Sequence, residues 1–117
     1  MMLNPVAGRL EQYMDLLAAR QKLIASNVAN AATPGYKTRD IDFQFELQSA
    51  LAAPEAGSRP NVIEARGLKS RNDGNNVSLD RESRLMAETA MRFNIASNLW
   101  KQQLRQIRGA IQEGRNG

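Results

Sequence analysis

Apolar residues recur along the first third of the chain at alternating spacings of four and three residues, as in an amphipathic helix. This row has one polar member, Gln21, and consists of Leu10, Met14, Leu17, Gln21, Ile24, Val28 and Ala31. Tyr13, Leu16 and Leu23 lie beside the row and widen the apolar face. The pattern predicts a helix of about six turns, and the width of the face predicts contact with more than one neighbour.

A proline and a glycine end this helix at Thr33. Pro34 disfavours helical backbone at the residue before it, and Gly35 can adopt the positive φ that the third position of a type II turn requires. The run Thr33-Pro34-Gly35-Tyr36 is therefore predicted to form a defined turn.

A second and longer row predicts a helix over residues 80–117. Asp80 is a candidate N-cap, Gly114 a candidate stop, and Gly109 predicts fraying of the last turns. The row consists of Met86, Ala90, Phe93, Ser97, Trp100, Leu104, Ile107 and Ile111, and Met91, Ile95 and Leu99 flank it. Two long helices at the two ends of a short chain predict a mainly α fold, in which they form an antiparallel, coiled-coil-like hairpin.

The middle of the chain, residues 37–79, holds few large apolar residues and is expected to be irregular, extended or partly disordered. Phe43, Leu47 and Leu51 behind a candidate cap at Asp42 favour a short amphipathic helix, although Ile41, Phe43 and Phe45 also alternate like a strand. Turn chemistry at residues 72–75 suggests a small β-ribbon between residues 62–68 and 77–79. The chain thus divides into an N-terminal helix and turn at 1–36, this middle segment, and a C-terminal helix at 80–117.

Composition narrows the possible chemistry. The 117 residues include no Cys and no His, which removes disulfides, imidazole bases and the usual zinc ligands. The acid pairs Asp40 with Asp42 and Asp80 with Glu82 lack a recognisable catalytic motif and are interpreted as helix caps. We therefore assign no catalytic, cofactor-binding or metal-binding residue. No apolar run reaches the roughly 20 residues of a membrane span, and the first five residues lack the features of a cleaved secretory signal.

The net charge of +4 leaves a binding function open. Lys101, Arg105 and Arg108 form one basic row, and no acid occurs between Glu88 and Glu113. Such a row could bind a nucleic acid or an anionic membrane surface. A solvated helix face that complements the helix dipole explains the same row.

The apolar rows point more strongly to assembly. One pair of helices leaves apolar surface over, and each further buried Leu or Ile contributes about 1.5 to 3 kcal/mol. A monomeric helical hairpin remains the alternative. The residues expected to serve helix packing and assembly are Leu10, Met14, Leu17, Ile24, Val28, Met86, Phe93, Trp100, Leu104, Ile107 and Ile111.

The end of the first helix resembles a known family. The run from Leu23 to Lys37 is similar to the N-terminal signature of bacterial flagellar rod, hook and related axial proteins, and its motif and turn residues are Asn27, Asn30, Thr33, Pro34, Gly35 and Tyr36. Residues 39–43 and 73–82 resemble the proximal rod members of the basal-body rod family, and residues 44–72 have no counterpart.

The resemblance implies a non-enzymatic, structural subunit of the hollow helical rod that transmits motor torque, with its terminal helices lining the export channel. It implies export by the flagellar type III apparatus into a periplasmic basal body. The implied partners are other rod subunits, the adaptor between rod and membrane ring, and the export gate, with no nucleic acid and no membrane insertion. For Asn27 and Asn30, capping of the last helical turn and hydrogen bonds between subunits both remain open, and Tyr36 and Phe43 are candidate anchors of the segment after the turn.

Overall fold

The computed structural model describes residues 5–53 and 59–116, so expectations for residues 1–4, 54–58 and 117 lie outside the described part. The fold is mainly helical, as predicted. Its elements are α1 (Pro5–Ala29), β1 (Arg39–Ile41), α2 (Phe43–Ala52), β2 (Val62–Glu64) and α3 (Leu79–Asn116).

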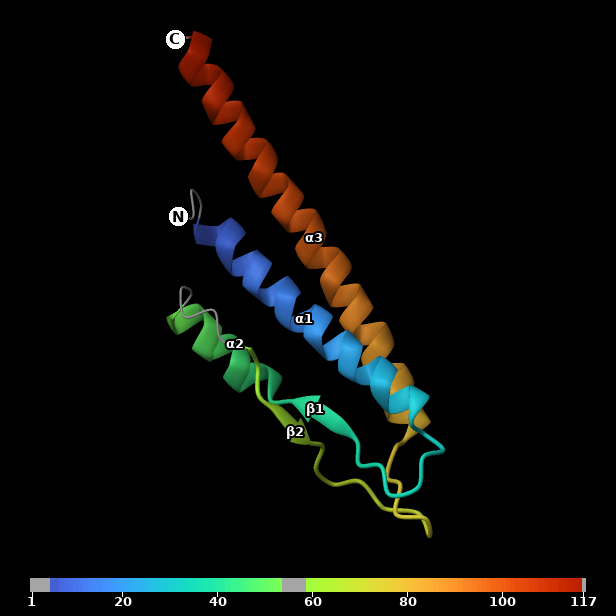
Figure 1. Cartoon of the computed structure of the whole chain (residues 1–117). Helices are drawn as coiled ribbons and strands as arrows, with labels where there is room; N and C mark the ends of the chain where they lie inside the picture. Colours follow the sequence, from blue (N-terminus) through green and yellow to red (C-terminus); the bar gives the residue numbers. More distant parts are fainter. Residues whose placement is uncertain (1–4, 54–58, 117) are drawn as a thin grey trace.

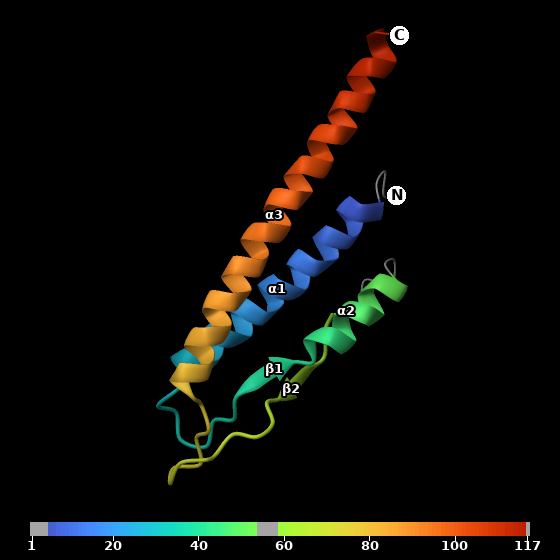
Figure 2. The same cartoon turned by 180° about the vertical axis from the view of Figure 1, so that it is seen from behind.

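The two long helices form the predicted antiparallel hairpin, and α1 lies between α3 and α2 (Figure 1). The prediction that the first helix meets more than one neighbour is therefore confirmed. The molecule is elongated, with extents of 71 × 26 × 18 Å. Because α3 has 38 residues and α1 has 25, α3 projects past the N-terminal end of α1, as the reverse view also shows (Figure 2).

Helix α1 buries Leu16, Leu17 and Ile24 against its neighbours. It starts at Pro5 and ends at Ala29, so the expectation that the helix continues through Ala31 to Thr33 was wrong. The side-chain Nδ2 of Asn30 donates to the carbonyl of Ser26 at 2.8 Å. This bond satisfies a carbonyl of the last turn and helps to end the helix there.

The turn after α1 has the predicted geometry. The backbone N–H of Tyr36 donates to the carbonyl of Thr33 at 3.2 Å, and Gly35 has a φ of 77°. A positive φ at this position is the mark of a type II turn, and it explains why a glycine follows Pro34.

The short helix α2 was also predicted correctly. The carboxylate of Asp42 accepts a hydrogen bond from the backbone N–H of Phe45 at 3.2 Å, as an N-cap does. Helix α2 packs on α1 through an edge-to-face contact between Phe43 and Tyr13, with ring centroids 5.8 Å apart. The Arg20 guanidinium lies 5.7 Å from the centre of the Phe43 ring.

A small two-stranded ribbon is present, but the prediction that it pairs residues 62–68 with residues 77–79 was wrong. Instead β2 pairs antiparallel with β1, with Ile63 opposite Asp40. Residues 75–77 do not pair as a strand because their N–H groups have other acceptors. The Val77 N–H donates to Asn75 Oδ1 at 2.8 Å, and the Asn76 N–H donates to the Tyr36 carbonyl at 3.2 Å. Asn75, Asn76 and Val77 are buried, so this part of the middle segment packs onto the helices.

Helix α3 begins one residue before the expected start and does not use the expected cap. Ser78, rather than Asp80, caps it, because the Ser78 hydroxyl accepts from the Arg81 N–H at 3.2 Å. The stop expected at Gly114 was wrong as well, since the helix continues to Asn116. Gly114 does not adopt the positive φ of a glycine that ends a helix, so α3 continues past it.

The row of α3 that faces α1 differs from the most hydrophobic row. Glu82, Thr89 and Ala96 are the buried residues of this helix, whereas Met86, Phe93 and Ile111 of the predicted row are exposed. Trp100, Leu104 and Ile107 are half-buried. Small side chains at positions 89 and 96 allow the two helix backbones to approach closely, and the larger apolar residues are left outside this contact.

Candidate functional site

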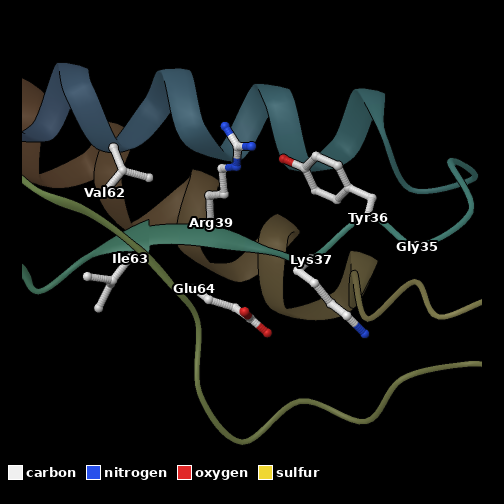
Figure 3. A pocket seen from close by; sticks show the side chains of 7 residues that line it. All are labelled: Gly35, Tyr36, Lys37, Arg39, Val62, Ile63 and Glu64. Atoms are coloured by element: carbon white, nitrogen blue, oxygen red, sulfur yellow. The ribbon is translucent and has the colours of Figure 1, made fainter.

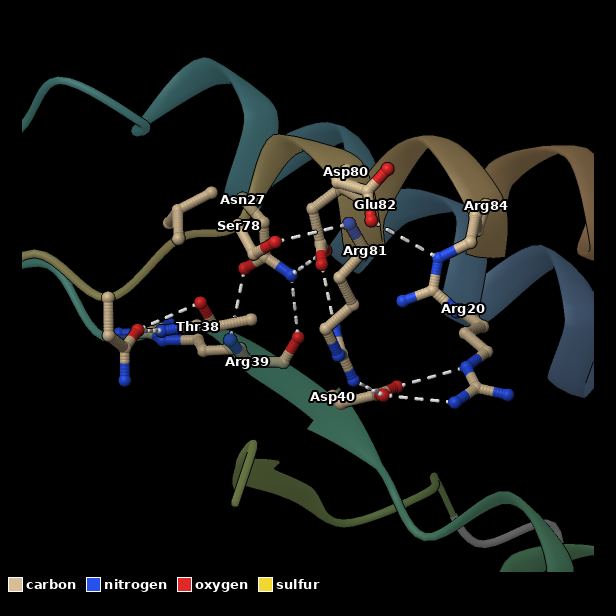
Figure 4. Close-up of polar contacts among 12 residues, drawn as sticks. Arg20, Asn27, Thr38, Arg39, Asp40, Ser78, Asp80, Arg81, Glu82 and Arg84 are labelled. Atoms are coloured by element: carbon tan, nitrogen blue, oxygen red, sulfur yellow. Dashed lines mark hydrogen bonds and ion pairs between the residues drawn. The ribbon is translucent and has the colours of Figure 1, made fainter. Parts of the chain in front are cut away.

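A buried polar junction joins α1, β1 and α3 next to the turn, and Asn27 lies at its centre (Figure 4). The Asn27 amide donates to the carbonyl of Arg39 at 2.8 Å and accepts from the backbone N–H of the same residue at 3.0 Å. Its side chain therefore pairs with the free edge of β1 as a neighbouring strand would. The Tyr36 hydroxyl also donates to Asn27 at 2.9 Å, and Asn27 Nδ2 donates to the Glu82 carboxylate at 2.5 Å.

These contacts differ from the two roles considered for Asn27. Its buried amide neither caps the last turn nor faces a neighbouring subunit, because it bonds to Arg39, Tyr36 and Glu82 of its own chain. Asn30 does cap the last turn. Tyr36 and Phe43 anchor the post-turn segment onto α1 of their own chain.

The charged part of the junction is a chain of ion pairs. Asp40 accepts a two-pronged contact from Arg20, at 3.1 and 3.0 Å, and a third bond from Arg81 at 2.6 Å. Arg81 also donates to the fully buried Glu82 at 2.6 Å. Arg81 thus bridges β1 and α3, which fixes how the two elements sit on α1.

The environment of the ion pairs shifts two pKa values. Burial alone would raise the pKa of Asp40, but hydrogen bonds from Arg20 and from the Ile41 N–H outweigh it, so the net pKa is lowered. Burial alone would lower the pKa of Arg81, but its bonds to Glu82 and Asp40 raise it. Both groups therefore keep their charges at neutral pH. The interpretation of Asp40 and Glu82 as helix caps was wrong, and of the four acids considered only Asp42 caps a helix.

A second polar cluster fastens the loop of residues 70–77 to the end of α1. The side chain of Asn75 donates to the carbonyls of Asn30 and Thr33, both at 2.9 Å. Arg71 donates to the carbonyl of Ala31 at 2.6 Å and to that of Val77 at 2.8 Å. Carbonyl groups of the turn that follows α1 thus accept hydrogen bonds from residues about 40 positions away.

A surface hollow of about 530 Å³ lies beside the turn and the two strands (Figure 3). Its lining residues are Gly35, Tyr36, Lys37, Arg39, Val62, Ile63 and Glu64. The amine of Lys37 is already bonded to Ser70 and Gly74. This lining contains no nucleophile paired with a base, so the hollow suggests no reaction. Among the described residues no group of three acids could hold a metal ion.

The exposed side of α3 is the second candidate site. It carries apolar side chains that remain partly exposed: Leu79, Met86, Met91, Phe93, Ile95, Leu99 and Ile111. Of the residues expected to serve packing, Leu17 and Ile24 are buried inside the chain, whereas Leu10 and Met14 are half-buried and Val28 is exposed. The predicted set therefore has its fully buried members on α1, whereas none of its members on α3 is fully buried.

The junction residues on β1 and α3 were not identified as a site from the sequence. Asp40, Arg81 and Glu82 fall inside the runs 39–43 and 73–82 that resemble rod proteins, and this shared location was the available signal. No helix in the described ranges is long and apolar enough to cross a bilayer.

The chain is similar to flagellar proteins along most of its length. A family model described as flagella basal body rod protein matches residues 14–37, which include Asn27 and the turn. The flagellar basal body rod protein FlgB of Cereibacter sphaeroides is 32% identical, over 86% of this chain and 88% of that protein. FlgB of Salmonella typhimurium is 30% identical, over 89% and 91%. FlgB of Yersinia ruckeri is 27% identical, over 97% of this chain and all of that protein.

Proposed function

This chain belongs to the flagellar basal body rod protein family, and we propose that it is a structural subunit of the proximal rod that polymerises through its terminal helices. The family is structural, so the chain is not an enzyme. As a basal-body rod protein it assembles with other components of the flagellar basal body.

The exposed apolar surface of α3 carries this proposal. Met91 and Ile95 are more than half exposed, at 57% and 55%, and exposed apolar patches of this kind mark interaction surfaces. Each one buried in an interface would contribute about 1.5 to 3 kcal/mol. A subunit whose apolar surface is covered by its neighbours needs this arrangement.

The distribution of polar residues on α3 suits a hollow rod. With about 3.6 residues per turn, Ser83, Asn94 and Asn98 lie roughly opposite the side that contacts α1. Lys101 and Arg105 continue that polar strip, and all five residues are exposed. When neighbouring subunits cover the apolar flanks of α3, this strip remains to face an aqueous channel.

The junction suits the transmission of torque. Ion pairs and hydrogen bonds link α1, β1 and α3 at several points, so a twisting force on one element is passed to the others. The partners in this assembly are other rod subunits, the adaptor between rod and membrane ring, and the export gate. Export without a cleaved signal peptide and a location in the periplasmic rod complete the proposal.

Deletion of the gene, followed by complementation, tests this function. Cells without the protein should lack filaments and complete basal bodies, and the wild-type gene should restore both. Leu104→Asp places a carboxylate in an apolar row and should fail to restore them, because an unpaired buried charge costs several kcal/mol. Deleted cells that swim with intact rods would overturn the assignment.

A further inference from the structure

Strand β2 has one paired edge and one free edge. Within the described residues the sheet consists of β1 and β2 alone, and β2 lies beyond β1 as seen from α1 (Figure 1). Val62 and Ile63 point to opposite faces of the sheet, yet both are exposed, at 52% and 40%. A free edge with exposed apolar side chains is a template for pairing with a further strand.

The register of the sheet shows which backbone groups lie at the free edge. Bonded residue pairs alternate with non-bonded pairs along an antiparallel ladder, and the Ala65 N–H donates to the Thr38 carbonyl at 2.8 Å. The next bonded residue of β2 is therefore Ile63. The N–H and C=O groups of Val62 and Glu64 consequently point away from β1.

The other edge of the sheet follows the same rule and is already occupied. Arg39 stands opposite Glu64, and its N–H and C=O groups point away from β2. Both bond to the side-chain amide of Asn27, at 3.0 and 2.8 Å. Among residues 5–53 and 59–116, no side chain does the same for β2. The chain therefore closes the β1 edge itself and leaves the β2 edge open.

The surface around the open edge is strongly basic. Residues 35–39 and 59–71 contain one acid, Glu64, against six cations: Lys37, Arg39, Arg59, Arg66, Lys69 and Arg71. Lys37 and Arg71 bond to oxygen atoms of their own chain. The other four cations are exposed and make no ion pair within the described ranges. Lys37 and Arg39 also line the hollow beside β2 (Figure 3).

From the open edge and its charge we infer that β2 binds an extended segment of a partner protein, which carries acidic side chains and adds to the sheet as a third strand. Free N–H and C=O groups along one edge fit the backbone of an extended polypeptide. A nucleic acid matches the cations but has no row of backbone N–H donors for the free carbonyls. The basic surroundings favour acidic segments over basic ones. This surface is separate from the terminal helices and extends the proposed function.

Fluorescence anisotropy with a short labelled peptide that alternates valine with aspartate tests the inference. The wild-type chain should bind this peptide saturably, and binding should slow the exchange of the Val62 and Glu64 amides roughly tenfold or more. The same peptide with every amide N-methylated keeps its charges but loses its N–H donors, so it should bind roughly tenfold to a hundredfold more weakly. A peptide with lysine in place of aspartate should also bind at least about tenfold more weakly.

Two variants of the chain provide a matched pair. Val62→Pro removes an N–H group at the open edge and leaves the bonded residues Ile63 and Ala65 unchanged, so it should weaken binding roughly tenfold or more. Val62→Thr keeps that N–H group and a β-branched side chain, and it should bind within about threefold of the wild type. Protection of the Ala65 amide from exchange checks that each variant keeps the sheet.

Three outcomes would overturn the inference. Equal binding of the N-methylated peptide would show that the surface recognises charge alone, as a nucleic-acid site does. Unchanged affinity of Val62→Pro with an intact sheet would place the peptide elsewhere on the chain. A wild type that binds no acidic peptide at millimolar concentration would exclude the third strand, while polymerisation through the terminal helices would stand.

Discussion

The two ends of the helix hairpin differ in which side chains they bury and which they expose. Near the turn, charged and polar groups such as Asn27, Asp40 and Glu82 are buried and find their partners inside the chain. Toward the far end, α3 exposes Ile95, Leu99 and Ile111 to solvent. The buried polar groups near the turn are satisfied by folding alone, whereas these exposed apolar residues of α3 would be covered only in the proposed assembly.

Removal of the buried Glu82 carboxylate should destabilise the polar end of the hairpin, and this should be the largest of the effects. Glu82→Ala leaves Asn27 Nδ2 without one of its two acceptors and Arg81 without one of its two partners. Loss of one member of a buried ion pair costs about 3 to 5 kcal/mol. Urea denaturation should therefore show a large fall in the free energy of unfolding.

Asp80→Ala provides the matched control for that variant. Asp80 is an acid in the same first turn of α3, but its side chain is 87% exposed and lies 3.5 Å from Arg84. Its loss should change stability little. Equal destabilisation by the two substitutions would contradict the claim that the buried network holds this end together.

The turn should be the next most sensitive position. Gly35 has a φ of 77°, and its backbone N–H donates to the Asp73 carbonyl at 2.8 Å, so the turn also fastens the loop. Gly35→Val forces a β-branched residue into a left-handed conformation, at a cost on the order of 1 to 3 kcal/mol. The shift in denaturation midpoint measures this cost.

Substitution of Gly109, near the C-terminal end of α3, should raise the stability rather than lower it. Gly109 lies within α3, and an added Cβ there would meet nothing within 4 Å. Gly109→Ala should stabilise the helix by about 0.5 to 1 kcal/mol. If the Gly35 substitution were as harmless as this one, the turn would have no structural role.

The sequence could predict what depends on local patterns. Residue spacing predicted both long helices, Pro34 with Gly35 predicted the turn, and Asp42 predicted the start of α2. The junction could not be predicted this way, because Asn27 and Glu82 are 55 positions apart. Residue spacing also could not identify the row of α3 that faces α1. A search for the most hydrophobic row selects Met86 and Phe93, whereas close packing of two helices favours small residues such as Thr89 and Ala96.

Acid should weaken the polar end selectively. The folded state lowers the pKa of Asp40, so the carboxylate stabilises the protein above its unfolded pKa of about 3.9, and this contribution is lost as the pH falls through the folded pKa. One such group changes the free energy of unfolding by at most about 1.4 kcal/mol per pH unit. Asp40→Asn should flatten the acid branch of the stability curve, and an unchanged slope would exclude Asp40 as its source.

The smallest effect is expected from the basic residues of α3. Replacement of Lys101 and Arg105 by Gln leaves the apolar residues of α3 unchanged and removes two exposed charges. Motility should stay near normal, and no salt-dependent binding to DNA or RNA is expected at physiological ionic strength. Steep salt-dependent binding that weakens in this variant would favour the nucleic-acid alternative.

Hydrogen exchange of the same protein as monomer and as polymer distinguishes the part held by folding from the part held by association. Amides at the junction, such as those of Thr38 and Val77, should be protected equally in both states. Amides of α3 from residue 91 to 113 should exchange roughly tenfold or more slowly once the polymer forms. Protection that appears at the junction only in the polymer, or α3 amides equally protected in both states, would contradict the account.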